Sequence, residues 1–192
     1  ALMLAQEIHE VKKDSERIYA GLSKIITIER SDTYALSDLL RMITKSNARY
    51  SEYLQKDIHF EVIFNEDFET KEHILLLAML NNIVANAIEV SETKGFIKLE
   101  VTTTPNVITF TIENNGPCIP ENVLPVIFDP GYTTKFNENG IASTGIGLSH
   151  VQTIAYRLEG TITVSSNETT IFTITIPTYK LRLRRTLCVI LL

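Results

Sequence analysis

Hydrophobic residues in the first third of the chain recur in steps of three and four, a period of 3.5 that predicts two helices with one apolar stripe each. The first stripe comprises Leu4, Ile8, Val11, Ile18, Leu22 and Ile25, with Ser15 at a polar position within it. The second comprises Leu36, Leu40, Ile43, Tyr50 and Leu54, with Asn47 in the corresponding place. We therefore expect residues 1–57 to form an antiparallel helical hairpin that pairs with a second hairpin in a four-helix bundle, and hence a homodimer.

The remainder of the chain switches between the helical period and the alternation of strands. Strands are predicted at residues 58–64, 96–104, 107–113, 161–165 and 170–177, and helices at about 75–90 and 147–158. This order predicts an α+β domain over residues 58–178, with its sheet behind the helices. Residues 179–192 follow as a tail of the kind that a cloning vector appends, and we assign no function to it.

Composition limits the classes of protein that fit. Hydrophobic residues make up 44% and charged residues 21% of the 192 positions, which is the balance of a soluble protein with a real core. The net charge of −5 offers no basic surface for nucleic acid. Cys118 and Cys188 form no CxxC pair, which fits a reducing compartment and argues against structural zinc. No run of eighteen apolar residues is present, so we expect no direct membrane insertion of this sequence.

Two amides lie within the most apolar predicted helix. Asn82 and Asn86 are four residues apart and so share one face, where polar groups need partners. A metal ion bound to phosphate groups would supply one. Hydrogen bonds to nearby backbone carbonyls or to water explain the same pair without a ligand.

Three loops carry further candidate chemistry. Asn114 follows a strand, and its side-chain oxygen could accept a hydrogen bond from the amine of adenine, while Gly116 permits a tight turn. Lys135 precedes a polar stretch and could meet terminal phosphates, although a loop lysine is usually solvated. Gly145 and Gly147 stand where a helix begins, so their N–H groups could cradle a triphosphate or could simply allow close packing.

Taken in order, these pieces resemble the ATP-binding domain of the GHKL superfamily, and together with the predicted hairpin they look like a sensor histidine kinase over residues 4–177. Residues 82–86 are similar to the N box, 114–119 to the G1 box, 128–135 to the F box and 144–148 to the G2 box. The resemblance implies an α/β sandwich with a mixed, largely antiparallel sheet, helices on one face, and ATP with Mg²⁺ as cofactors.

The resemblance also implies a role for individual residues. It assigns Asn86 to Mg²⁺, Asn82 to the phosphates and Asn114 to adenine. The other nucleotide-contacting residues that it implies are Gly116, Ile119, Lys135, Thr144, Gly145, Gly147, Leu148 and Thr170. In the nucleotide-binding part the sequence departs from the family at four positions: Asn114 replaces an aspartate, Cys118 and Ser143 replace glycines, and Glu89 stands where many relatives have a basic residue.

His9 and Glu10 have two interpretations. On their own they are polar residues on a solvated helix face. Beside a nucleotide domain, the His-Glu pair with Lys12 looks like the family's H box, in which His9 accepts the phosphoryl group and Glu10 orients the ring and takes up its proton. Lys13 and Asp14 depart from the common form of that box.

We therefore interpret the chain as the cytoplasmic catalytic core of a sensor histidine kinase that phosphorylates His9 and passes the group to the receiver domain of a response regulator. A membrane-anchored sensor region is expected upstream. One alternative is an ATPase or serine kinase of the same superfamily, although Asn82 occupies the place of the ATPases' general base, and an amide cannot accept a proton. The other is a noncatalytic dimeric signalling module.

Overall fold

The computed structural model describes residues 33–135, 140 and 142–183. His9 and Glu10, with the first predicted helix, lie outside this range. The elements in chain order are β1 (Tyr34–Ala35), α2 (Leu36–Tyr53), β2 (Asp57–Phe64), β3 (Glu69–Thr70), α3 (His73–Val90), β4 (Lys94–Thr103), β5 (Val107–Asn114), α4 (Gly147–Arg157), β6 (Thr161–Ser166), β7 (Thr170–Pro177) and α5 (Thr178–Leu181).

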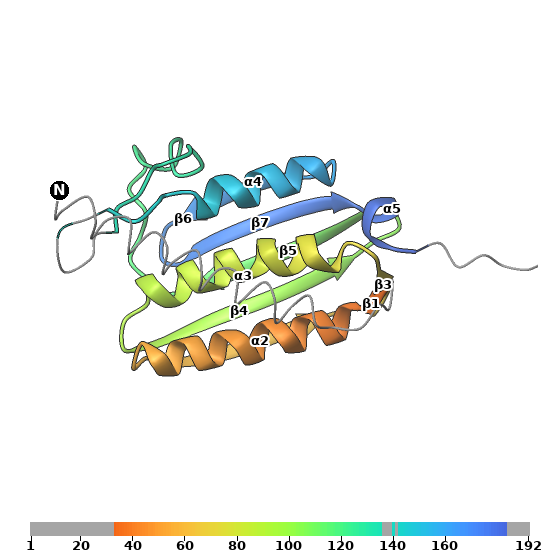
Figure 1. Cartoon of the computed structure of the whole chain (residues 1–192), viewed down its shortest axis with the longest axis horizontal. Helices are drawn as coiled ribbons and strands as arrows, with labels where there is room; N and C mark the ends of the chain where they lie inside the picture. Colours follow the sequence, from red (N-terminus) through yellow and green to blue (C-terminus); the bar gives the residue numbers. More distant parts are fainter. Residues whose placement is uncertain (1–32, 136–139, 141, 184–192) are drawn as a thin grey trace, which may run out of the picture. The chain divides into compact units, whose positions relative to one another are not determined.

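Five strands form one sheet in the order β2-β4-β5-β7-β6, and β1 pairs with β3 separately. The β2–β4 pair is parallel, and the other pairs of the large sheet are antiparallel. Helices α2, α3 and α4 lie side by side over one face of this sheet (Figure 1). The predicted α/β sandwich with a mixed, largely antiparallel sheet is confirmed.

The alternation of side chains along the central strand explains why the sheet has one covered face. In β5, Ile108, Phe110 and Ile112 are fully buried. Thr109 and Thr111 alternate with them and are only partly buried. Successive side chains of a strand point to opposite faces, so the apolar set meets the helices and the threonines meet solvent.

Helix α3 is the middle helix of the layer. Among the described residues it is the one helix that is long and apolar enough to cross a membrane by length and composition. It contacts α2, α4 and the strands β4 and β5, and eight of its residues are buried. These are Leu76, Leu77, Met79, Leu80, Ile83, Val84, Ala87 and Ile88. Burial on several sides accounts for its apolar composition.

Helix α2 corrects the predicted domain boundary. The hydrophobic pattern of residues 36–54 predicts a helix of a dimerisation hairpin, but the helix packs against α3 and β2 within the compact unit that begins at Thr33. Leu36, Leu40 and Ile43, predicted to face a second helix of the hairpin, are buried in the sandwich core. The predicted domain boundary between residues 57 and 58 is therefore wrong, because α2 belongs to the compact unit that begins at Thr33. A repeat of 3.5 reveals an apolar stripe and does not identify what covers it.

Polar contacts between α2 and the rest of the sandwich support this assignment. Asn47, the polar position within the stripe, donates from Nδ2 to Asn81 Oδ1 on α3 at 2.7 Å. The first turn of α2 has no side-chain cap at Ala35, and instead Asp67 accepts hydrogen bonds from Ser37 N at 3.0 Å and Ser37 Oγ at 2.6 Å. The loop between β2 and β3 thus satisfies a backbone donor that a helix start leaves open.

Candidate functional site

A cavity of about 470 Å³ opens between α3, the loop after β5, the segment before α4 and the strand β7. Asn86 and Gly145, which are far apart in the sequence, both line it. A volume of this size suits a ligand the size of a nucleotide. Its lining includes nine of the predicted site residues: Asn86, Asn114, Ile119, Lys135, Thr144, Gly145, Gly147, Leu148 and Thr170.

One end of the cavity is built by the last residue of β5 and the first residue of β7. Asn114 and Thr170 are directly opposite each other in the antiparallel ladder. The Thr170 hydroxyl lies 2.7 Å from Ser166 Oγ, which also accepts a hydrogen bond from the Ile119 N–H at 2.8 Å. Ser166 therefore ties the loop after β5 to the floor of the cavity.

Asn114 is the most enclosed polar side chain of this floor, with 2% of its surface exposed. Its Nδ2 atom is buried and has no hydrogen-bond partner among the described residues. Gly116 lies beneath it, because a Cβ there would come within 2.8 Å of Asn114 Nδ2 and 2.9 Å of Val90 Cγ2. A buried donor without an acceptor is costly, which indicates that a ligand or water completes the site.

Glycines shape the opposite wall. Gly145 has φ +61°, and a Cβ there would lie 2.5 Å from the backbone carbon of Gly131. The Gly131 N–H donates to the Gly145 carbonyl at 3.1 Å, so the two segments meet backbone to backbone. Gly147 begins α4, and a Cβ on it would approach Asn82 Oδ1 at 3.3 Å. This close approach brings the start of α4 against the amides of α3.

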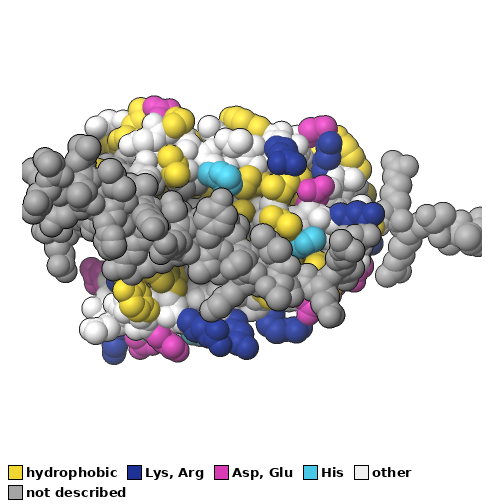
Figure 2. Space-filling view, in the orientation of Figure 1, with side chains coloured by type: hydrophobic (Ala, Val, Ile, Leu, Met, Phe, Trp, Pro, Cys, Tyr) yellow, Lys and Arg dark blue, Asp and Glu magenta, His cyan; other side chains and the backbone are white. Residues whose placement is uncertain are grey.

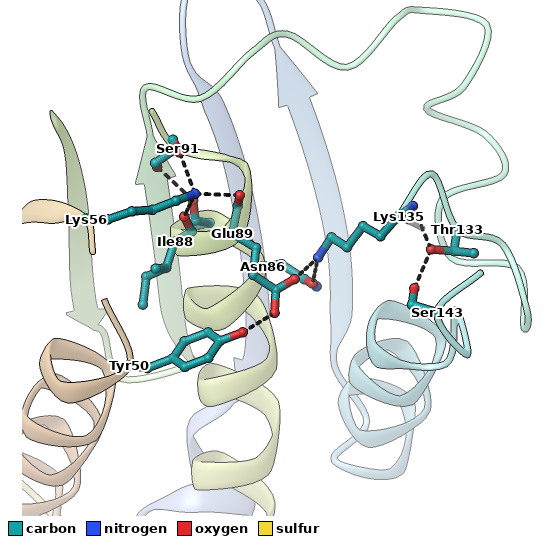
Figure 3. A network of polar contacts seen from close by, with 10 residues as sticks. Tyr50, Lys56, Asn86, Ile88, Glu89, Ser91, Thr133, Lys135 and Ser143 are labelled. Atoms are coloured by element: carbon teal, nitrogen blue, oxygen red, sulfur yellow. Dashed lines mark hydrogen bonds and ion pairs between the residues drawn. The ribbon is translucent and has the colours of Figure 1, made fainter. Parts of the chain in front are cut away.

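A lysine bridges the cavity to α3 (Figure 3). Lys135 Nζ donates to Asn86 Oδ1 at 2.7 Å and forms an ion pair with the Glu89 carboxylate. Glu89 also accepts a hydrogen bond from the Tyr50 hydroxyl at 2.6 Å. Burial, reinforced by this carboxylate, raises the pKa of Tyr50 well above its ordinary value. An amide oxygen and a carboxylate thus hold one positive charge at the cavity wall.

The end of α3 that presents Glu89 is fixed by a second lysine. Lys56 Nζ donates to the carbonyl oxygens of Ile88, Glu89 and Ser91 at 2.8, 2.7 and 2.6 Å (Figure 3). These carbonyls lack partners within the helix, and a positive charge suits the negative end of its dipole. Lys56 therefore holds the last turn of α3, and with it Glu89, in place.

Two predicted residues do not line the cavity. Asn82 Nδ2 donates to the Ala78 carbonyl one turn earlier at 2.7 Å, which is the ligand-free alternative raised for this amide. Gly116 supports the floor from below. Asn82 is nevertheless adjacent to the cavity, through its approach to Gly147.

Several lining residues were missed by the sequence analysis. The apolar walls are completed by Val123, Ile127, Tyr132 and Phe172. The position of Phe172 two residues after Thr170 on a strand would have placed it on the same face. Tyr50 is not a lining residue, but it contacts Glu89, and this contact was not predicted because its helix was assigned to a different domain.

The charged surface and the cavity differ in character. Arg41, Lys45 and Arg49 of α2 are exposed at intervals of four residues, and basic side chains gather along the lower edge of the face that Figure 2 shows. An apolar cavity with a buried amide at one end and with amides, a lysine and helix-starting glycines at the other is the arrangement of a nucleotide-binding α/β sandwich.

Comparison with known proteins agrees with a nucleotide-binding α/β sandwich. The family model described as histidine kinase-, DNA gyrase B- and HSP90-like ATPase matches residues 71–180. The chain belongs to this family of ATP-using domains. The expected resemblance to sensor histidine kinases is likewise confirmed by individual relatives, and these do not favour an ATPase or a noncatalytic module.

The sensor histidine kinase GlnK of Bacillus subtilis is 42% identical over 180 residues, covering 92% of this chain and 44% of GlnK. The heme sensor protein HssS of Staphylococcus haemolyticus is 36% identical over 105 residues, covering 54% of this chain and 22% of HssS. The chain thus spans less than half the length of these relatives.

Solved structures show the same fold. The catalytic domain of the histidine kinase ThkA superimposes with a TM-score of 0.63 at 26% identity, covering 76% of this chain and 97% of that domain. The mycobacterial sensor histidine kinase MprB gives a TM-score of 0.65 at 18% identity, covering 79% and 99% of the two chains.

Proposed function

We propose that this chain is the ATP-binding catalytic part of a sensor histidine kinase, which transfers the γ-phosphoryl group of ATP to His9. The observation that carries the proposal is the single cavity lined by residues of all four boxes, from Asn86 to Leu148. A family relative at 42% identity that is itself a sensor histidine kinase supports it.

The base of ATP is assigned to the floor of the cavity. Asn114 Oδ1 would accept a hydrogen bond from the 6-amino group, and Thr170 lies beside it in the sheet. Ile119, Leu148 and Phe172 supply apolar lining. A planar purine fits such a slot because it has two apolar faces and a polar edge.

The phosphates are assigned to the wall where α4 begins. Backbone N–H groups at Thr144, Gly145 and Gly147 and the positive end of the helix dipole favour anions there. Asn82 is adjacent to this segment and would contact the phosphates when they are bound. Lys135 would exchange its contacts with α3 for the terminal phosphate.

The residues on α3 fit a magnesium ion. The Lys135 ammonium is a cation held by the side-chain oxygens of Asn86 and Glu89, and hard oxygen ligands of this kind suit Mg²⁺ when substrate phosphates complete its shell. Asn86 is therefore the proposed metal ligand. A bound Mg²⁺ would supply neutralisation of the phosphate charge during transfer.

His9 is the proposed nucleophile. One ring nitrogen would attack the γ-phosphorus while the other is oriented by Glu10, and the bond between the γ-phosphorus and the bridging oxygen breaks to release ADP. The phosphoryl group would then pass to the receiver domain of a response regulator. The proposal includes a homodimer in the cytoplasm, joined to a membrane-anchored sensor region upstream.

Incubation of the chain with γ-labelled ATP tests the proposal. We expect label that is lost in acid and stable in base, as histidine phosphate is, and we expect His9→Gln to abolish it while nucleotide binding persists. His59→Gln, the same change at an exposed histidine of β2, is the matched control and should keep the label. Acid-stable label, or undiminished label in His9→Gln, would contradict the assignment.

A further inference from the structure

The floor of the cavity carries a polar group, the Asn114 amide, whose nitrogen lacks a hydrogen-bond partner among the described residues. Asn114 is almost completely buried, lines the cavity, and has an Nδ2 atom with no hydrogen-bond partner among the described residues. Nδ2 is enclosed beside Gly116, and no acceptor among the described residues fixes it there. An amide that turns about its last side-chain torsion presents its oxygen to the cavity in one orientation and its nitrogen in the other.

An amide differs from the carboxylate that the family resemblance leads one to expect here. A carboxylate only accepts hydrogen bonds, whereas an amide accepts through oxygen and donates through nitrogen. Adenine presents a donor at its 6-amino group and an acceptor at N1. A 6-oxopurine, such as hypoxanthine or guanine, presents the reverse pattern, with an acceptor at O6 and a donor at N1.

The amide of Asn114 can match either pattern. The side-chain torsion that exchanges Oδ1 and Nδ2 is roughly two-fold, so both orientations are accessible. No acceptor among the described residues holds Nδ2 in one orientation. The neighbouring hydroxyls of Thr170 and Ser166, 2.7 Å apart, can each donate or accept and so impose no single pattern.

The carboxylate that lines the cavity, Glu89, already has hydrogen-bond partners. Glu89 lines the cavity but is bound to the ammonium of Lys135 and to the hydroxyl of Tyr50. It therefore does not act as a second acceptor that would repel O6. A carboxylate at position 114, in contrast, would place an oxygen against O6 and exclude a 6-oxopurine.

We propose that the base end of this cavity binds 6-oxopurine nucleotides as well as adenine nucleotides, because the Asn114 amide rotates to match either edge. The inference rests on the proposed function, since it assumes that the cavity binds a nucleotide base at Asn114. It adds the class of base that the site accepts.

Calorimetric titration of the full chain with ADP and with IDP, each with Mg²⁺, tests the inference. IDP is chosen because hypoxanthine lacks the 2-amino group of guanine, so the comparison isolates position 6 and N1. We expect the two dissociation constants of the wild-type chain to differ by less than about 100-fold, whereas sites with fixed hydrogen-bond patterns discriminate by about 10⁴-fold. A larger ratio in the wild-type chain overturns the inference.

Asn114→Asp should raise the preference for ADP over IDP by about 100-fold or more, because it restores an acceptor-only group. Asn115→Asp is the matched control. Asn115 is exposed, and its Oδ1 accepts a hydrogen bond from the Phe96 N–H at 2.8 Å, which an aspartate preserves. The ratio of the IDP and ADP dissociation constants in Asn115→Asp should therefore equal that of the wild type. An unchanged ratio in Asn114→Asp overturns the inference.

The two proposals fail separately. If the wild-type chain binds ADP but rejects IDP, the inference about the base is wrong and the nucleotide site stands. If it binds neither nucleotide, the proposed function itself is wrong. Should Asn114→Asp not fold, the wild-type ratio alone decides the inference.

Discussion

At the scale of single residues, the structure gives Glu89 a role that the sequence alone does not indicate. Many relatives have a basic residue at this position, so the sequence alone predicts that one contact to phosphate is lost. In the structure it forms an ion pair with Lys135, which comes from a different segment, and accepts the Tyr50 hydroxyl. This wall of the cavity therefore does carry a positive charge, but Lys135 supplies it and the residue at position 89 does not.

Lys135→Met should weaken binding of a non-hydrolysable ATP analogue by about tenfold, since a charge-assisted contact to phosphate is lost and Glu89 is left unpaired. Calorimetry measures this directly. Lys94→Met, at an exposed lysine outside the cavity lining, is the control and should bind normally. Adding Glu89→Gln to Lys135→Met should recover part of the loss. Equal affinity in Lys135→Met and wild type would remove the lysine from the phosphate site.

Gly145 combines a positive φ with close backbone neighbours, so its position restricts substitution twice. Gly145→Ala would force a side chain at positive φ into the backbone of Gly131 and Tyr132, and should lower the free energy of unfolding by about 2 to 4 kcal/mol. Gly140 also has positive φ but no described residue within 4 Å of an added Cβ, so Gly140→Ala isolates the strain of the backbone and should cost about 1 kcal/mol. Urea unfolding of both variants gives the comparison. Equal losses would show that the contact with Gly131 is unimportant.

At the scale of secondary-structure elements, α2 shows what a hydrophobic pattern predicts and what it leaves open. The helix itself was predicted at residues 36–54 and is found at Leu36–Tyr53. Its partners were wrong, because an apolar stripe fits α3 and β2 as well as another helix. The contact that could have corrected the assignment, Asp67 capping Ser37, joins residues 30 positions apart and leaves no local signal in the sequence.

This cap predicts a dependence on pH. Burial alone would raise the pKa of Asp67, but the hydrogen bonds from Ser37 and Phe68 outweigh it and lower the pKa. A carboxyl group whose pKa is lower when folded stabilises the fold above its unfolded pKa of about 3.9, and the contribution is lost as pH falls through the folded value.

Asp67→Asn should therefore destabilise the chain at pH 7 by about 1 kcal/mol, the usual worth of a helix cap, and the difference from wild type should shrink as pH falls below about 4. Urea unfolding at several pH values measures it. Ser37→Ala removes only the bond from Ser37 Oγ, because its backbone N–H still donates to Asp67, so the double variant should be little worse than Asp67→Asn alone. A difference that is constant with pH would mean that the carboxylate charge plays no part.

The β-strands were easier to predict than the helix partners. Alternation along β5 and β7 placed Asn114 and Thr170 at strand ends, and the antiparallel ladder sets them opposite each other. The signal is local, because a strand's own sequence defines its two faces. The contact between Lys135 and α3 is not local in this sense, since it depends on how a loop after the sheet returns to the helix layer.

At the scale of the whole molecule, the sandwich brings four distant segments to one place. Helix α3 lies between α2 and α4, so its amides face the start of α4, while β5 and β7 are neighbours and present their ends at the same side of the sheet (Figure 1). With α2 inside the sandwich, the predicted homodimer now depends on the stripe from Leu4 to Ile25 alone. Dimerisation and the acceptor role of His9 remain predictions.

The central claim is that one cavity holds a nucleotide together with its cation, and calorimetric titration of the chain with ADP in the presence and absence of Mg²⁺ tests it most directly. We predict that Mg²⁺ tightens binding to the wild-type chain by about tenfold or more, and that Asn86→Ala binds ADP equally with and without the ion. Tightening by Mg²⁺ that is as strong in Asn86→Ala as in the wild type, or absent from both, would contradict the account.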